Sequence, residues 1–70
     1  MYVNGFSERL GKAVYNKNVS YEEVVRQTGI SRSCMYGYIY EGKMPSCVNL
    51  VKLANYLGVT TDYLLGRIEK

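Results

Sequence analysis

The chain contains no histidine and only two cysteines, which restricts the chemistry it can perform. Histidine is the commonest general base and the commonest metal ligand in proteins. Cys34 and Cys47 are thirteen residues apart and form no CxxC motif, and no further metal ligands lie near them in the sequence. We therefore expect no zinc site, no cofactor and no enzymatic activity. We expect both cysteines to be reduced thiols that are buried or half-buried.

Long apolar segments are also absent. No segment approaches the roughly 18 apolar residues that a membrane-spanning helix needs. The first six residues have neither the basic end nor the apolar run of a signal peptide. These absences predict a cytoplasmic protein with no membrane partner. With a single proline, 47% hydrophobic residues and 21% charged residues, the composition is that of a globular protein and not of a disordered one.

The length of 70 residues corresponds to one small domain. A chain of this size buries only about 60% of the surface that it exposes when unfolded. Two packed domains, a TIM barrel and a doubly wound nucleotide-binding fold are excluded on length alone. The net charge of +3 is compatible with a polyanionic partner but is too small to require one.

Apolar residues recur at helical spacing, and no alternating strand pattern of any length is present. The sequence predicts an all-α fold of five short helices at about 6–17, 21–28, 32–40, 47–57 and 61–65. The domain is expected to span residues 6–66, between short tails at 1–5 and 67–70. The candidate core residues of the first four helices are Phe6, Leu10, Ala13 and Val14; Val24 and Val25; Met35 with either Tyr38 or Ile39; and Leu50, Leu53, Ala54 and Leu57.

Polar residues that favour helix starts precede each helix. The candidate N-caps are Asn4 or Ser7, Ser20, Ser31, Ser46, and Thr60 or Thr61. Glu23 follows Ser20 at the spacing of a capping box, in which each side chain would bond to the other residue's backbone N–H. Asn18 suits a left-handed residue at the end of the first helix, because Asn tolerates positive φ better than most residues.

The connection between the second and third helices is the most informative segment. It is a tight turn, Thr28-Gly29-Ile30-Ser31. Gly29 allows the backbone to reverse, Ile30 supplies an apolar side chain for the core, and Ser31 starts the next helix. Two short helices joined in this way are typical of a helix-turn-helix, whose second helix lies in the DNA major groove.

At this point the sequence resembles the helix-turn-helix domain of phage repressors of the lambda, 434 and Cro type, the Xre family. The segments that carry the resemblance, in order, are Val19–Val24, Gly29–Ser33, Gly42–Ser46, Leu50–Val59 and Asp62–Arg67. The resemblance implies a compact five-helix lambda-repressor-like domain, sequence-specific binding to double-stranded DNA, and a homodimer on a palindromic operator.

Among the departures from the family's pattern, two concern positions that contact a phosphate. Tyr21 stands where the family usually has a Gln that contacts a phosphate, and its phenol can donate the same hydrogen bond. Val14 stands where the family often has an Arg that contacts phosphate.

Arg32 is the first candidate DNA contact, because it begins the predicted recognition helix, about 32–40. An arginine can donate two hydrogen bonds to O6 and N7 of guanine. The alternative is a solvated arginine. Ser31 and Ser33 flank it, and their hydroxyls can bond to a phosphate or a base edge. Ser31 is also expected to act as the N-cap.

Tyr36 and Tyr40 follow Arg32 on the same side of the helix. Each can contact a thymine methyl group or a phosphate, and Gly37 between them would permit close approach to the groove. The alternative is that Tyr36 is half-buried packing. Lys43, in the loop that follows, is expected to contact the sugar-phosphate backbone. The seven candidate DNA-binding residues are Tyr21, Ser31, Arg32, Ser33, Tyr36, Tyr40 and Lys43.

Residues 20–46 carry three basic and three acidic side chains, so this segment has no net charge and non-specific affinity should be modest. Tyr56 and Tyr63 either form a dimer face or cap the core. The predicted function is a transcriptional regulator, a repressor from a phage or other mobile element, with no small-molecule ligand. The alternative is a protein-interaction module of the same fold that binds a toxin or an antirepressor.

Overall fold

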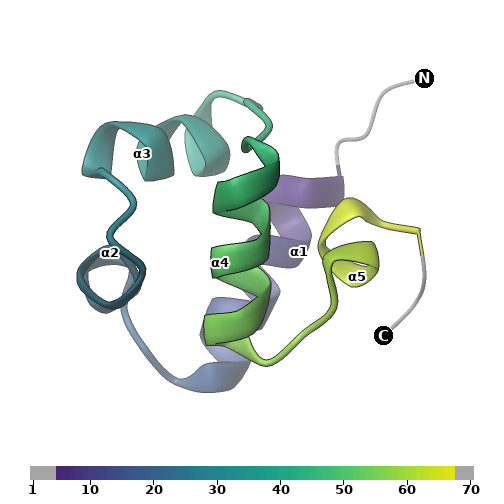
Figure 1. Ribbon diagram of the computed structural model, residues 1–70, viewed down its shortest axis with the longest axis horizontal. Helices are drawn as coiled ribbons and strands as arrows, with labels where there is room; N and C mark the ends of the chain where they lie inside the picture. The colour runs from purple at the N-terminus through teal and green to yellow at the C-terminus, as the bar shows by residue number, and fades with distance from the viewer. Residues whose placement is uncertain (1–4, 68–70) are drawn as a thin grey trace.

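A computed structural model describes residues 5–67, which form five helices and no strand (Figure 1). The helices are α1 Gly5–Lys17, α2 Tyr21–Thr28, α3 Arg32–Tyr40, α4 Cys47–Leu57 and α5 Thr61–Leu65. The all-α fold expected from the sequence is confirmed. Within this range, none of the helices is both long enough and apolar enough to cross a membrane.

The arrangement of the five described helices leaves the outer side of α3 uncovered by another helix. In Figure 1, α2 and α3 form one end of the molecule and α5 lies at the other end, with α4 between them. α3 packs against α1 and α2, whereas α5 packs against α1 and α4. The two helices of the predicted helix-turn-helix therefore lie together at one end.

Four helices begin at a hydroxyl side chain, as the sequence predicts. The side chains of Ser20, Ser31, Ser46 and Thr60 each accept a hydrogen bond of 3.0–3.2 Å from the backbone N–H three residues later. Thr60, and not Thr61, caps α5. Asn18 adopts the expected left-handed conformation after α1, with φ of 65°. These local signals place the helix boundaries within one residue of the prediction.

One of the two candidate caps of the first helix is wrong, and the predicted capping box forms only in part. Ser7 is the third residue of α1 and does not cap it, because its hydroxyl donates a hydrogen bond of 2.8 Å to the carbonyl oxygen of Ile39. The alternative cap, Asn4, lies outside the described residues. The capping box at Ser20 is only half formed, because the carboxylate of Glu23 accepts hydrogen bonds from Arg26 and Gln27 instead of the Ser20 N–H.

The described range also cuts through both predicted tails. Gly5 is the first residue of α1, and residues 1–4 of the predicted N-terminal tail lie outside the range. Arg67 is attached to α5, because its N–H donates to the Asp62 carbonyl oxygen at 2.8 Å. Residues 68–70 of the predicted C-terminal tail lie outside the range.

The core draws apolar side chains from every helix. Its least exposed members are Phe6 and Leu10 from α1, Val24 from α2, Leu53 from α4 and Leu64 from α5. Almost all of the candidate core residues are buried, while Val25 and Leu50 pack partly buried against the core.

On α3, Met35 and Tyr38 are the buried pair, and Ile39 is only partly buried. The Tyr38 ring packs edge-on against Phe6 at 5.8 Å between ring centroids. Its hydroxyl accepts a hydrogen bond of 3.0 Å from the Asn49 side chain. Tyr38 therefore occupies the core position for which the sequence left two candidates.

The expectation of buried or half-buried cysteines is wrong, because Cys34 and Cys47 are both exposed. Cys34 is the third residue of α3, whose inner side is already occupied by Met35 and Tyr38. Cys47 is the first residue of α4 and lies on the solvent side of the helix start.

Substitution of Ile30 by Ala should destabilise the fold by about 2–5 kcal/mol, because Ile30 is only 3% exposed and its loss leaves a cavity between α2 and α3. Val48→Ala is the matched control, since Val48 is 62% exposed and its truncation should change stability by about 0.5 kcal/mol or less. Urea unfolding followed by circular dichroism measures both. Equal effects of the two substitutions would show that Ile30 does not hold the turn.

Candidate nucleic-acid interface

The turn between α2 and α3 is held by its backbone and by one buried side chain. Gly29 has φ of 78° and its N–H donates to the Val25 carbonyl oxygen at 2.9 Å. The positive φ is the conformation that favours glycine. Ile30 is buried, and its N–H donates to the Thr28 hydroxyl at 3.3 Å. The turn therefore fixes the direction in which α3 leaves α2, and it leaves the first residues of α3 exposed.

Four of the seven candidate residues lie around one open depression on the surface. They are Arg32, Ser33, Tyr36 and Lys43, and Glu41 completes the lining. The outer side of α3 and the loop that follows it form the depression. Ser31 lies just before it, where its hydroxyl is occupied as the N-cap of α3.

The expectation that Gly37 opens the helix surface toward a groove is wrong, because Gly37 is buried. The backbone N–H of Lys43 donates to the Gly37 carbonyl oxygen at 3.1 Å, and a Cβ at position 37 would lie 3.0 Å from Cδ of Lys43. The glycine thus makes room for the returning loop. The Lys43 ammonium group extends beyond it and lies 3.3 Å from a carboxylate oxygen of Glu41.

Tyr36 and Tyr40 are 57% and 69% exposed, so Tyr36 is not the half-buried packing residue of the alternative interpretation. Their ring centroids are 4.9 Å apart. The two rings form an exposed aromatic strip along α3. Such a strip can contact either a nucleic acid or a protein.

Tyr21 lies apart from the depression, between α2 and α1. It is 37% exposed, and its hydroxyl oxygen lies 3.3 Å from the point where a Cβ on Gly11 would be. Partial burial, and secondarily the proximity of Tyr40, raise the pKa of the Tyr21 phenol above its ordinary value. The phenol is therefore protonated at neutral pH and able to donate a hydrogen bond.

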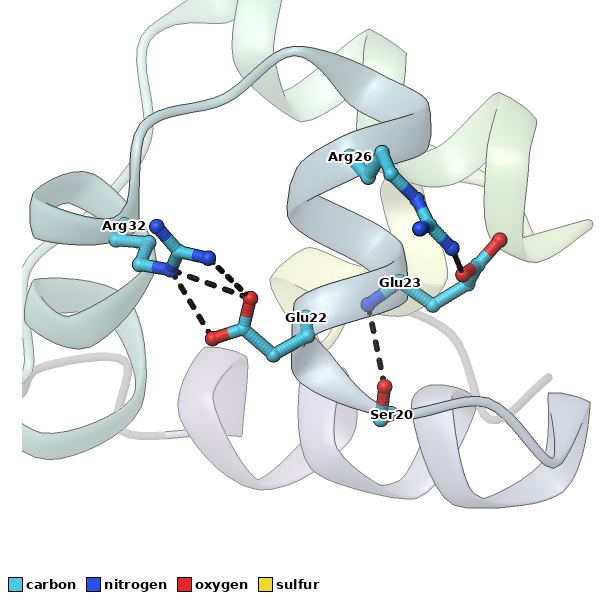
Figure 2. Close-up of polar contacts among 5 residues, drawn as sticks. All are labelled: Ser20, Glu22, Glu23, Arg26 and Arg32. Carbon is cyan, nitrogen blue, oxygen red and sulfur yellow. Dashed lines mark hydrogen bonds and ion pairs between the residues drawn. The ribbon is translucent and has the colours of Figure 1, made fainter.

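Each basic side chain of residues 20–46 is paired with an acidic one. Arg26 pairs with Glu23, Arg32 with Glu22, and Lys43 with Glu41. Figure 2 shows the first two pairs, one within α2 and one that joins α2 to α3. The equal numbers of charges in the sequence thus correspond to three one-to-one ion pairs.

The Glu22–Arg32 pair is the contact that the sequence analysis missed. Arg32 Nε donates to both carboxylate oxygens at 3.2 and 3.0 Å, and Nη2 donates to one of them at 2.5 Å. These hydrogen bonds lower the pKa of the Glu22 carboxyl and raise that of the guanidinium. Because ten residues separate the partners, only the angle between α2 and α3 brings them together.

Tyr56 and Tyr63 lie far from this surface and pack partly buried against the core. The Lys17 ammonium lies 4.9 Å from the centroid of the Tyr56 ring, and the Arg9 guanidinium lies 5.4 Å from that of Tyr63. A cation from α1 therefore covers one face of each ring.

No group of three or more His, Cys, Asp or Glu side chains within residues 5–67 is placed to hold a metal ion. Apart from the Glu41 carboxylate, the side chains that line the depression carry hydrogen-bond donors, hydroxyls and an aromatic ring. This is the chemistry that binds phosphates and base edges.

Comparison with known proteins gives two matches. A family model described as "Helix-turn-helix domain" matches residues 7–69. The chain is also 43% identical over 61 residues to the SPbeta prophage-derived uncharacterized HTH-type transcriptional regulator YonR of Bacillus subtilis (strain 168). This alignment covers 86% of the chain but only 56% of the relative, so the chain spans little more than half of that protein's length. No solved structure matches the chain.

Replacement of Arg32 by Ala should raise the pKa of the Glu22 carboxyl toward the ordinary value of 4.5, because its main stabilising hydrogen bonds are lost. The pKa of Glu23 should stay low, since Gln27 and Arg26 cause its depression. An NMR titration of the glutamate carboxyl carbons measures both groups in one sample. An unchanged Glu22 pKa in the variant would contradict the pairing.

The same pair makes stability depend on pH in a defined direction. A carboxyl with a depressed pKa in the folded state stabilises that state above the pKa of the unfolded chain. This stabilisation is lost as the pH falls through the lower, folded pKa. The melting temperature should therefore decline below about pH 4.5. The decline should be smaller in Glu22→Gln, and an equal decline in both proteins would contradict a stabilising role for the pair.

Proposed function

This chain belongs to the family of helix-turn-helix domains, and on that basis we propose that it is a sequence-specific, double-stranded DNA-binding transcriptional regulator. In this proposal α3 lies in the major groove. The observation that carries it is the depression lined by Arg32, Ser33, Tyr36 and Lys43, on the side of α3 that no other helix of residues 5–67 covers.

In the proposed complex with DNA, the five candidate residues at the start of α3 and along it have distinct roles. Arg32 donates to a guanine, and Ser31 and Ser33 bond to phosphate or base edges near the start of α3. Tyr36 and Tyr40 contact thymine methyl groups or a phosphate with their exposed rings.

The remaining two candidates bind the DNA backbone. Lys43 exchanges its Glu41 partner for a phosphate oxygen. Tyr21 donates its phenolic hydrogen to a phosphate beside the start of α2. Neither contact carries sequence information, so both would set the position of the domain on the duplex.

The wider function proposed is that of a phage or mobile-element repressor that binds a palindromic operator as a homodimer. The similarity to a prophage-derived regulator supports this assignment. A dimer is also favoured by the charge balance, because one neutral α2–α3 segment supplies little electrostatic attraction and two copies double the base contacts. Tyr56 and Tyr63 are the proposed dimer face.

A second candidate function is a protein-interaction module of the same fold. The exposed tyrosine strip favours it, since aromatic side chains are enriched in protein interfaces. In this case Arg32 would have no role in recognition.

Substitution of Arg32 by Ala should weaken binding to the preferred duplex by about tenfold or more and relax the preference at one base pair. Arg26→Ala is the matched control, because it removes the same charge from another exposed Arg–Glu pair. The preferred sequence is selected from a random duplex library, and fluorescence anisotropy at two salt concentrations gives the affinities. Equal losses in both variants would indicate that Arg32 contributes only charge.

The selected sequence should be an inverted repeat whose half-sites are about 10 base pairs apart, or a multiple of one helical turn. Sedimentation of the complex should give two chains per duplex. One chain per duplex, with equal affinity for a single half-site, would contradict the dimer.

A further inference from the structure

The hydrogen bonds between Glu22 and Arg32 use only one edge of the guanidinium group. A guanidinium carries five N–H bonds in one plane. Glu22 takes the side edge, formed by Nε and one hydrogen of Nη2. The end edge, formed by Nη1 and the second hydrogen of Nη2, makes no hydrogen bond within residues 5–67. This end edge has the two parallel donors that O6 and N7 of a guanine accept.

We propose that Glu22 is a specificity-determining positioning residue that holds Arg32 by its side edge and so presents the end edge to a guanine. The inference rests on the proposed DNA-binding function. Glu22 lies in the first turn of α2 and Arg32 is the first residue of α3, so the pair joins the two helices of the motif (Figure 2). Glu22 itself need not touch the DNA.

Two opposite effects on binding follow from this arrangement. An exposed arginine loses side-chain freedom when it binds a base, and a carboxylate that fixes it beforehand reduces that loss. This effect raises the preference for the correct base pair. The same carboxylate adds a negative charge near the phosphates, which weakens binding to every sequence alike. Glu22 should therefore increase specificity while it decreases overall affinity.

Glu23 provides a matched control for the charge effect. It neighbours Glu22 in the first turn of α2, and it also pairs with an exposed arginine, Arg26. Glu22→Ala and Glu23→Ala each remove one carboxylate from the same helix turn. Only the first releases Arg32.

The experiment compares these two variants with the parent chain and with Arg32→Ala. Anisotropy titrations use the selected duplex, a set in which each base pair is replaced in turn, and a scrambled duplex. Arg32→Ala identifies the base pair that Arg32 contacts. Circular dichroism and thermal melting verify that every variant is folded.

At the base pair identified with Arg32→Ala, we expect Glu22→Ala to reduce the preference for the correct base by about fivefold or more. This is the lower end of the discrimination that one bidentate contact provides. Glu23→Ala should keep the parent's preference. Both variants should bind the scrambled duplex more tightly than the parent does. In an Arg32→Ala background, Glu22→Ala should cause no further loss of preference.

Three results would overturn the inference. If Glu22→Ala keeps the same preference as Glu23→Ala, Glu22 contributes only its charge. If Glu22→Ala increases the preference, the carboxylate competes with guanine for Arg32. If the parent binds all duplexes equally, or Arg32→Ala alters the preference at no base pair, the proposed reading of DNA through Arg32 fails and the inference fails with it. The first two results leave the DNA-binding proposal intact.

Discussion

The geometry of the α3 surface depends on the turn from Thr28 to Ser31. Gly29 supplies the left-handed backbone that reverses the chain, and Ile30 ties the turn to the core. Ser31 then begins α3 with a hydrogen-bonded cap. The backbone of the turn and the burial of Ile30 in the core together set the angle between α2 and α3. The meeting of Glu22 and Arg32, one near the start of each helix, is a consequence of that angle.

Most of the fold could be predicted because short-range residue patterns determine where its helices begin and end. Hydroxyl caps and left-handed residues bound α2, α4 and α5, and the apolar spacing identifies the core side of each helix. The predicted helix-turn-helix is confirmed by the family match. Two failures were long-range: the Ser7 hydroxyl donates to Ile39 in α3, and the exposure of Cys34 depends on which side of α3 faces the core. The incomplete capping box was a local failure, because Arg26 and Gln27 of the same helix bind the Glu23 carboxylate.

The candidate site was predicted in composition but not in its internal contacts. The sequence predicted seven DNA-binding residues, most of them on α3 or next to it, and four of the seven line one depression. It did not predict that the Lys43 stem covers Gly37, because that contact requires the path of the loop after α3. Nor did it pair Glu22 with Arg32. The balance of three acids and three bases was the available signal, but a count of charges does not identify partners.

The three ion pairs of residues 20–46 have a consequence for how such a domain would find its target. A DNA-binding protein with unpaired lysines and arginines binds any duplex non-specifically, because its contacts with the phosphates release condensed counterions whatever the sequence. Within residues 20–46 each cation already has a carboxylate partner, so this segment gains little free energy when it meets an unrelated DNA sequence. The residence time on such sequences would be short and sliding would be limited. The domain would search mainly by repeated collisions from solution, and few copies would be held on the competing sites of a genome.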